Sequence, residues 1–371
     1  MKVGVPREIK TQEHRVGLTP MAVREYVAAG HQVVVQAGAG DGIGATNAAY
    51  AAAGARIVDT ARNVFDAADM IVKVKEPQPA EWKMLREGQI LFTYLHLAPD
   101  GEQAIGLLNS GCIAVAYETV TDNAGGLPLL APMSEVAGRL AIEAAAFSLR
   151  KSNGGKGLLL GGVPGVPPAR VVVIGGGVVG TQAARMAVGL GAEVTILDRS
   201  LPRLRQLDDM LAGRVRTRYS TAASIEEEVL AADAVIGAVL IPGASAPKVV
   251  TRKMLGQMRP RSVLVDVSID QGGCFETSRA TTHEEPTYEV DDIIHYCVAN
   301  MPGAVPVTSS HALNHATLPF GLALAAEGEQ ALVRDPHLRH GLNIHRGRLT
   351  CLPVARALGL EYVSAELVLR I

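Results

Sequence analysis

The chain has 371 residues, of which 48% are hydrophobic and 19% charged, and its formal net charge at pH 7 is −2. This length predicts two domains, each with a core of its own, and the near-neutral charge excludes nucleic acid as the expected partner. The N-terminus lacks the apolar core of a signal peptide and no segment offers about eighteen uninterrupted apolar residues, so the sequence predicts a cytoplasmic protein without a membrane partner.

The first 120 residues alternate between short apolar strands and amphipathic helices. The expected strands cover residues 3–6, 32–36, 56–58, 70–74, 89–95 and 113–117. The expected helices cover residues 20–29, 60–68, 80–86 and 101–109. This alternation is typical of a doubly wound α/β domain with a parallel sheet.

A long helical run follows, and then a loop. Ser134 comes directly after Ala131-Pro132-Met133, and we expect it to cap a helix over residues 135–151 that bridges two domains. Residues 153–168 are rich in glycine and proline and predict a loop.

Residues 170–180, RVVVIGGGVVG, have the pattern of a dinucleotide-binding turn. Gly175, Gly177 and Gly180 fill the G-x-G-x-x-G frame between a buried strand and an apolar helix, and Asp198 ends the next strand. The three glycines would allow the turn, the approach of a pyrophosphate and close helix packing, and the Asp198 carboxylate would bind a ribose hydroxyl and repel a 2′-phosphate. This favours NAD over NADP, whereas the alternative is a glycine turn in an ordinary α/β domain.

Further strands are expected at residues 216–219, 234–238, 263–267 and 296–299, followed by an alanine-rich helix opened by Pro319 and running to about residue 333. The predicted fold is therefore α/β, with two doubly wound Rossmann-type domains and a cleft between them. Residues 1–130 and 305–371 would form a substrate-binding, catalytic domain, and residues 131–304 the NAD-binding domain.

Ligands of open parallel sheets bind outside the carboxyl ends of the strands, so polar residues at these ends are candidates for chemistry. Arg15 could bind a small carboxylate with its guanidinium, or be a surface arginine. Lys75 could polarise a carbonyl or bind a carboxylate. Lys73 shares its face in an extended strand, so the pattern does not choose between them, and at least one is expected to be solvated.

His96 and Asp270 also follow apolar strands. A histidine at the end of so apolar a strand could be a general acid and base, although a structural histidine is the alternative. Asp270 opens a glycine loop and could activate water, or cap the loop, whereas Asp266 lies within the strand and is expected to be structural. Neither the four cysteines nor the histidines have the spacing of a metal site.

The chain resembles the bacterial NAD-dependent alanine dehydrogenase family, within the superfamily that includes the alpha subunit of transhydrogenase. The resemblance runs nearly end to end. Its motifs occupy residues 5–10 (VPREIK), 13–16, 74–77, 93–98, 132–138, 268–273 and 297–302.

The resemblance implies that Arg15 and Lys75 bind substrate, that His96 is the acid and base, and that Asp270 assists the chemistry of water and the iminium. Beyond the three glycines and Asp270, it implies NAD contacts at Ser134, Val178, Val179, Asp198, Arg203, Ser220, Arg279, Ala299, Asn300 and Met301. Some relatives hold a divalent metal with a histidine on the helix after Pro319. Residues 321–327 here contain no histidine, so we expect no metal. Relatives are typically homohexamers.

The implied reaction converts L-alanine, NAD and water to pyruvate, ammonium and NADH. The alternative within the superfamily is the NAD-binding component of a transhydrogenase-like system, which passes hydride to a partner subunit. An NAD-binding protein without catalysis is a further alternative, and turnover would exclude it.

Overall fold

The computed structural model describes residues 1–239 and 246–371, and they form two compact units. The first unit contains Met1–Met133 and Val305–Ile371, and the second contains Ser134–Ala304. The first unit is therefore built from two separate stretches of chain, whereas the second is continuous.

The first unit contains an eight-stranded sheet in the order β15-β14-β6-β5-β4-β1-β2-β3. Its strands are β1 (Lys2–Val5), β2 (Gln32–Gln36), β3 (Arg56–Val58), β4 (Met70–Val72), β5 (Ile90–Thr93), β6 (Ile113–Ala116), β14 (Leu342–His345) and β15 (Arg348–Leu349). The six N-terminal strands are parallel, and this part of the prediction is confirmed. The antiparallel strands β14 and β15, which extend the sheet beyond β6, were not predicted.

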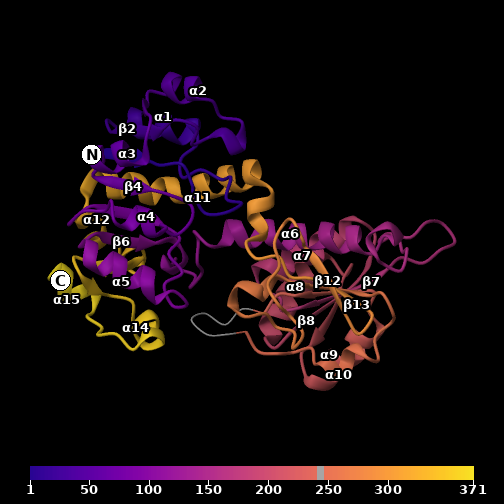
Figure 1. Ribbon diagram of the computed structural model, residues 1–371. Coiled ribbons are helices and arrows are strands. Elements are labelled where there is room, and N and C mark those ends of the chain that lie inside the picture. Colours follow the sequence, from indigo (N-terminus) through magenta and orange to yellow (C-terminus); the bar gives the residue numbers. More distant parts are fainter. Residues whose placement is uncertain (240–245) are drawn as a thin grey trace. The chain divides into compact units, whose positions relative to one another are not determined.

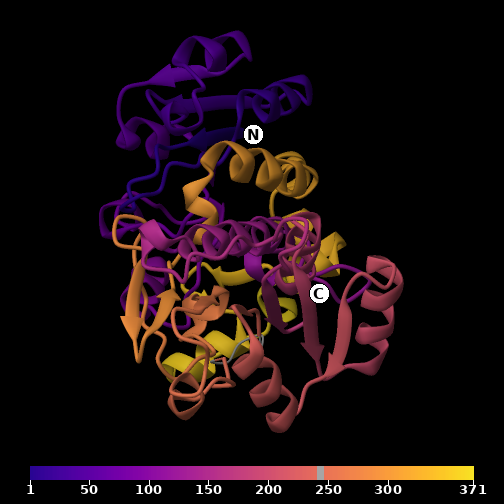
Figure 2. The same cartoon turned by 90° about the vertical axis from the view of Figure 1, so that its right-hand side faces the viewer.

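Helices cover both faces of this sheet. On one face, Ile71, Leu91 and Ala114 pack with apolar residues of the helices on that side. On the other, the long helix α11 comes so close that a Cβ at Gly321 would overlap the hydroxyl of Tyr26. Figure 2 shows the orange α11 next to the indigo N-terminal part of the same unit. The helices are α1 (Pro20–Ala28), α2 (Asn47–Ala52), α3 (Ala61–Ala67), α4 (Pro79–Trp82), α5 (Gly101–Ser110), α11 (Pro306–Glu327), α12 (Glu329–Arg334), α13 (Pro336–Arg339), α14 (Leu352–Leu358) and α15 (Ala365–Leu369).

The second unit contains a seven-stranded sheet in the order β12-β13-β11-β10-β7-β8-β9. All neighbours are parallel except β12 and β13, which pair antiparallel at one edge. The strands are β7 (Arg170–Ile174), β8 (Glu193–Asp198), β9 (Arg216–Tyr219), β10 (Ala234–Gly237), β11 (Val263–Asp266), β12 (Thr287–Val290) and β13 (Ile293–Tyr296).

The residues VVVI of β7 contribute side chains to the hydrophobic cores on both faces of this sheet. Val171 and Val173 pack with alanines of α6 (Ala131–Ser148) and α7 (Val178–Gly189), and Val172 and Ile174 pack on the opposite side. Because alternate side chains of a strand point to opposite faces, a strand buried on both sides reads as a continuous apolar run. In Figure 1, α6 and α7 lie above the strands, and α9 (Ala222–Ala231) and α10 (Arg252–Leu255) lie below them.

Two expected helix starts are wrong. Ser134 does not cap a helix, because α6 already begins at Ala131 and Ser134 lies inside its first turns. Pro132 is accommodated because the amide hydrogens of a first helical turn need no partner within the helix.

Pro319 does not open a helix either: it lies inside α11, which begins at Pro306. This helix ends at Glu327, and Gly328 follows with a φ of +58° and a ψ of −132°, a combination that is easily reached only by glycine.

The last strand expected in the second unit is also displaced. The expectation was residues 296–299, whereas β13 covers Ile293–Tyr296. It follows a tight reversal at Asp291 and Asp292, both with positive φ, which pairs it with β12 as a hairpin. Pairing with β12 fixes the register of β13, and the sequence pattern had not indicated that partner.

Candidate active site

The strand order brings three of the predicted substrate-site residues to one edge of the first sheet. Arg15, Lys75 and His96 lie in the segments that follow β1, β4 and β5, and these strands are adjacent and parallel in the order β5-β4-β1. The carboxyl ends of adjacent parallel strands meet at the same edge, so the three segments are neighbours.

Arg15 is buried, with only 2% of its surface exposed, and this excludes the surface-arginine interpretation. Its Nε and Nη2 donate to the two carboxylate oxygens of Glu13, at 2.7 and 2.6 Å, and its Nη1 lies 3.1 Å from the sulfur of Met133. Burial alone would lower the pKa of Arg15, but the hydrogen bonds and negative charge of Glu13 outweigh it and raise the pKa. Glu13 therefore orients a guanidinium that stays charged.

Neither lysine after β4 is solvated, so that expectation is wrong. The side chain of Lys73 is fully buried, and its Nζ lies 2.9 Å from Glu8 Oε2 and 2.8 Å from Glu81 Oε1. The side chain of Lys75 is 12% exposed, and its Nζ lies 3.8 Å from Glu76 Oε2. Because β4 ends at Val72, strand alternation does not extend to these residues. Lys73 is therefore an internal lysine, whereas the side chain of Lys75 is still partly exposed and available to a ligand.

His96 is held by two residues that the sequence analysis missed. Its backbone has a φ of +48°, its imidazole is stacked on Tyr94, and its side chain is 43% exposed. The carboxylate of Glu118 accepts a hydrogen bond from the His96 backbone N–H at 2.6 Å and lies 3.9 Å from Nδ1. Glu118 lies two residues after β6, the neighbour of β5, so applying the strand-end argument to the next strand would have found it.

The glycine-rich turn of the second unit has the geometry that its motif predicts. Gly175 has a φ of +104°, and a Cβ at Gly180 would overlap the carbonyl oxygen of Gly175. At Gly177, by contrast, a Cβ would meet nothing within 4 Å. Gly177 caps α7, so the first amides of this helix and the open space beside Gly177 suit a phosphate group. Val178 and Val179 begin this helix.

Asp198 fixes the same turn from the end of β8. Its Oδ2 accepts from the Gly176 N–H at 2.7 Å, and its Oδ1 accepts from the Ser200 N–H at 2.8 Å. Arg203 donates from Nε to the Gly176 carbonyl at 2.7 Å. The backbone of Ser220 donates to the Asp198 carbonyl, so the structure brings these predicted cofactor residues together around the turn.

A second group of predicted residues gathers after β11 and β13. Asp270 is exposed in a 3-10 helix over Val267–Gln271, and its Oδ1 lies 3.4 Å from the backbone nitrogen of Asn300, between Ala299 and Met301. Arg279 lies apart from this pair in its contacts, because its guanidinium stacks on the ring of Tyr288 at 4.0 Å. Asp266 is fully buried and accepts from the N–H of Cys274, which fits a structural role.

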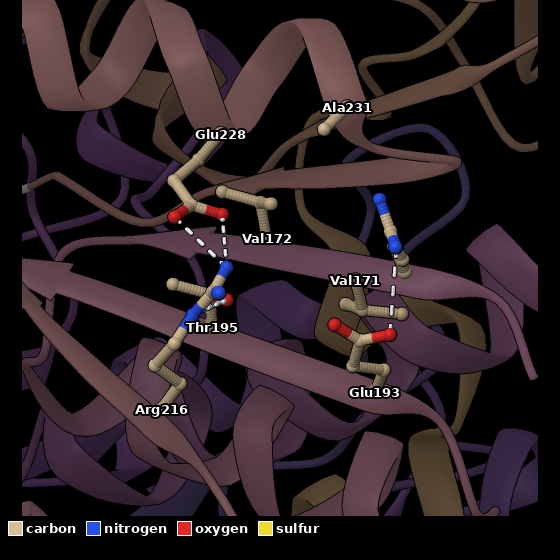
Figure 3. Close-up of a pocket in the computed structure, with 8 residues that line it drawn as sticks. Val171, Val172, Glu193, Thr195, Arg216, Glu228 and Ala231 are labelled. Atoms are coloured by element: carbon tan, nitrogen blue, oxygen red, sulfur yellow. Dashed lines mark hydrogen bonds and ion pairs between the residues drawn. The ribbon is translucent and has the colours of Figure 1, made fainter.

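Figure 3 shows a small polar pocket of the second unit, near the amino ends of β7, β8 and β9. It is lined by the first residues of three strands, Arg170, Glu193 and Arg216, and by Glu228 from α9. Arg216 reaches Glu228 at 2.6 Å, and Arg170 reaches Glu193 at 3.4 Å. These charges neutralise one another at the amino ends of the strands, away from Gly175, so this pocket is separate from the nucleotide-binding turn.

Across residues 1–239 and 246–371, no three His, Cys, Asp or Glu side chains gather as a group able to hold a metal ion. Within the same ranges, no helix combines the length and hydrophobicity that crossing a membrane requires.

Comparison with known proteins shows the family of this chain. Residues 4–137 match the alanine dehydrogenase/PNT N-terminal domain, and residues 141–351 match the C-terminal domain of the same family. An alanine dehydrogenase of Halomonas elongata is 61% identical over 98% of this chain and 99% of its own length.

Two solved structures have the same fold. An L-alanine dehydrogenase superposes with a TM-score of 0.94 at 50% identity, covering 97% of this chain and 99% of its own. A transhydrogenase from Sinorhizobium meliloti is more distant, with a TM-score of 0.80 at 26% identity, covering 95% and 99%. The chain therefore belongs to the alanine dehydrogenase family.

Proposed function

We propose that the protein catalyses the reversible oxidative deamination of L-alanine, in which L-alanine, NAD⁺ and water give pyruvate, ammonium, NADH and a proton. The observation that carries this proposal is the set of Arg15, Lys75 and His96 at one edge of the first sheet, two cations and one imidazole. Such a set suits a small acid with a carbonyl or amino group beside its carboxylate.

NAD, when bound, accepts the hydride from the Cα of alanine. Gly177 and the first amides of α7 would hold its pyrophosphate, and the open space at Gly177 supports this fit. We assign Ser134, Val178, Val179, Ser220, Arg203 and Arg279 as further cofactor contacts, together with Asp270 and the segment of Ala299, Asn300 and Met301. The Asp198 carboxylate would bind the ribose hydroxyls and disfavour a 2′-phosphate, which makes NAD the preferred cofactor over NADP.

Each reacting group of the substrate has a residue to hold it. Arg15, kept charged by Glu13, binds the carboxylate, and the Lys75 ammonium binds the carboxylate or the carbonyl oxygen. Alanine with a neutral amino group, its ammonium proton having passed to solvent, loses hydride and leaves an iminium, and water adds to its carbon. His96 accepts one proton of this water and returns it to the nitrogen, while the Asp270 carboxylate stabilises the cation and orients the water. The C–N bond then breaks, the remaining hydroxyl proton passes to the departing ammonia, and pyruvate and ammonium result.

The test follows NADH absorbance with pyruvate plus ammonium, with each substrate alone and NADPH as controls. Oxidation that needs both substrates and prefers NADH supports the proposal. Oxidation with pyruvate alone would identify a hydroxy-acid dehydrogenase instead. Tight NADH binding without turnover would identify a transhydrogenase-like component or a binding protein without catalysis.

We also propose that the protein is a cytoplasmic homo-oligomer, with the homohexamer as the expected form. Large apolar side chains are exposed at the end of α6 and in the segment after it, including Phe147 at 54% and Leu159 at 64%. This segment projects from the end of α6 in Figure 1. Exposed apolar groups of this kind are typical of subunit interfaces. Light scattering would measure the mass, and Leu159→Asp should lower it if this segment is an interface.

A further inference from the structure

The segment that carries Lys75 is fixed by a carboxylate that lies far from it in sequence. Glu8 Oε1 accepts from the backbone N–H of Val74 at 2.7 Å and from that of Lys75 at 3.4 Å. On the other side of Lys75, its carbonyl accepts from the hydroxyl of Thr93 at 3.0 Å. The backbone of Lys75 is thus held at both its N–H and its carbonyl, although it lies outside any strand.

A buried lysine holds Glu8 in turn. Glu8 Oε2 accepts from Lys73 Nζ at 2.9 Å, and the same ammonium donates to Glu81 Oε1 at 2.8 Å. The side chains of Lys73, Glu8 and Glu81 are at most 2% exposed. Glu81 Oε2 accepts from the Gln78 N–H and completes a capping box at the start of α4. The two carboxylates therefore share one ammonium but support different pieces of backbone.

Only a carboxylate satisfies all the donors around Glu8. Two backbone N–H groups and one ammonium point at its two oxygens, whereas an amide would turn its own NH₂ toward one of them. Burial raises the pKa of Glu8, and the charge of Lys73 opposes this rise. The Lys73 ammonium is therefore needed to keep Glu8 ionised, so that both of its oxygens remain acceptors.

We propose that Glu8 is a positioning residue for the substrate site, which fixes the backbone of Lys75 so that its ammonium reaches the substrate. This inference rests on the substrate-binding role proposed above for Lys75. Glu8 does not touch the substrate: it acts through Lys75.

The test compares Glu8→Asp with Glu81→Asp. Both variants keep a negative charge beside Lys73, but shortening Glu8 withdraws the acceptor from Val74 and Lys75, whereas shortening Glu81 withdraws it from Gln78. We expect Glu8→Asp to raise the KM for pyruvate roughly threefold to tenfold, as the loss of one or two hydrogen bonds implies. Glu81→Asp should leave this KM within about twofold of the parent, and neither variant should change the Kd for NADH.

A merely structural role predicts another result: equal shifts of KM in the two variants, or an unchanged KM in Glu8→Asp, would overturn the inference. Thermal unfolding of both variants shows whether their stabilities are matched. If Glu8→Asp does not fold, Glu8→Gln takes its place with Glu81→Gln as its control. The amide oxygen should face the Lys73 ammonium, so that its NH₂ replaces the acceptor of Val74 and Lys75, and the same rise in KM is expected. Lys75→Gln separates the two proposals. An unchanged KM for pyruvate in this variant overturns the role of Lys75, whereas a raised KM there with no change in Glu8→Asp overturns only the inference on Glu8.

Discussion

The imidazole of His96 lies parallel to the phenol ring of Tyr94, with 5.7 Å between the ring centroids and 8° between the ring planes. Tyr94 is itself fixed, because its hydroxyl donates to the carbonyl of Leu129 at 2.5 Å and its ring meets Tyr117 edge to face. A stacked imidazole loses much of its rotational freedom about χ2. The orientation of the proposed acid and base is therefore set by a buried aromatic cluster.

We expect Tyr94→Leu to lower kcat by about tenfold to a hundredfold, because the imidazole loses the ring that orients it. Tyr94→Phe keeps the ring and loses the hydrogen bond to Leu129, so its kcat should stay much closer to that of the parent. Steady-state kinetics at saturating pyruvate, ammonium and NADH measure both. Equal losses in the two variants would contradict an effect of stacking.

His96→Gln should lower kcat by about 10² to 10⁴, the contribution typical of a general acid and base. The Kd for NADH, measured by fluorescence titration, should not change, since His96 is not a proposed cofactor contact. His340→Gln, at an exposed histidine of the same unit, is the control and should behave as the parent. A parallel loss of turnover and NADH affinity would make His96 a structural residue.

Asp198→Asn should lower the preference for NADH over NADPH by at least about tenfold, since a neutral side chain no longer repels a 2′-phosphate. Asparagine keeps an acceptor oxygen for the Gly176 N–H, so the turn should persist. The ratio of kcat/KM for the two cofactors is the measurement. Asp208→Asn changes the same charge at an exposed position of α8 (Leu201–Leu211) and should leave the ratio as it is.

Gly177→Ala and Gly180→Ala should fail in different ways. At Gly177 an added methyl group meets open space, so the variant should fold with a normal Tm but bind NADH at least about tenfold more weakly, because the methyl occupies the approach to the helix start. At Gly180 the methyl overlaps the Gly175 carbonyl, so the variant should be strongly destabilised. Normal NADH binding by a folded Gly177→Ala variant would argue against a pyrophosphate at this turn.

Asp233 should make the stability of the second unit sensitive to acid. Its carboxylate accepts from the Arg170 N–H at 2.9 Å and from Lys156 Nζ at 2.8 Å. Burial would raise the pKa of Asp233, but these hydrogen bonds and the charges of Lys156 and Arg259 lower it below 3.8. A carboxyl group with a lowered folded pKa contributes stability that is complete above its unfolded pKa and is lost as pH falls through the folded pKa.

Asp233→Asn should therefore lower the free energy of unfolding at pH 7 by about 1.5 to 3 kcal/mol. The difference from the parent should shrink as pH falls below about 4, because Asp233 of the unfolded parent is protonated there and that of the folded parent only at its lower pKa. Urea unfolding across this range measures it. Glu193→Gln, which removes an exposed ion pair with Arg170, is the control, and a difference that stays constant down to pH 3 would contradict the role of the Asp233 charge.

The sequence predicted those elements whose signal is local. Strands β2 and β3 occupy the residues expected, because a short run of apolar, β-branched residues between turn residues defines each one. The strands β14 and β15 gave no comparable signal. Leu342–His345 is a strand because it pairs with β6, more than 200 residues earlier, and such a pairing is decided by tertiary structure.

The candidate site likewise contains residues that the sequence predicted and partner residues that it did not. Arg15 and His96 follow strand ends, and a rule about parallel sheets makes them candidates, whereas only the family resemblance selected Lys75 over Lys73. The partners that orient them are Glu13, Glu8, Tyr94 and Glu118. Of these, Glu8 is 66 residues from the backbone nitrogen of Val74 that it binds, so no local pattern relates the two. The pairing of Lys73 with Glu8 and Glu81 in the core was not predicted for the same reason, and at least one of Lys73 and Lys75 was wrongly expected to be solvated.

Because the first unit is built from two separate stretches of chain, it can be completed on the ribosome only after the second unit has been synthesised. Every strand of the second sheet has been synthesised by residue 296, whereas β6 keeps an open edge until residues 342–345 emerge. Helix α11, which covers Tyr26, is also made late. Domains generally fold as units during synthesis, so we expect the nascent N-terminal stretch to wait, with an unpaired strand edge, while the inserted unit folds first.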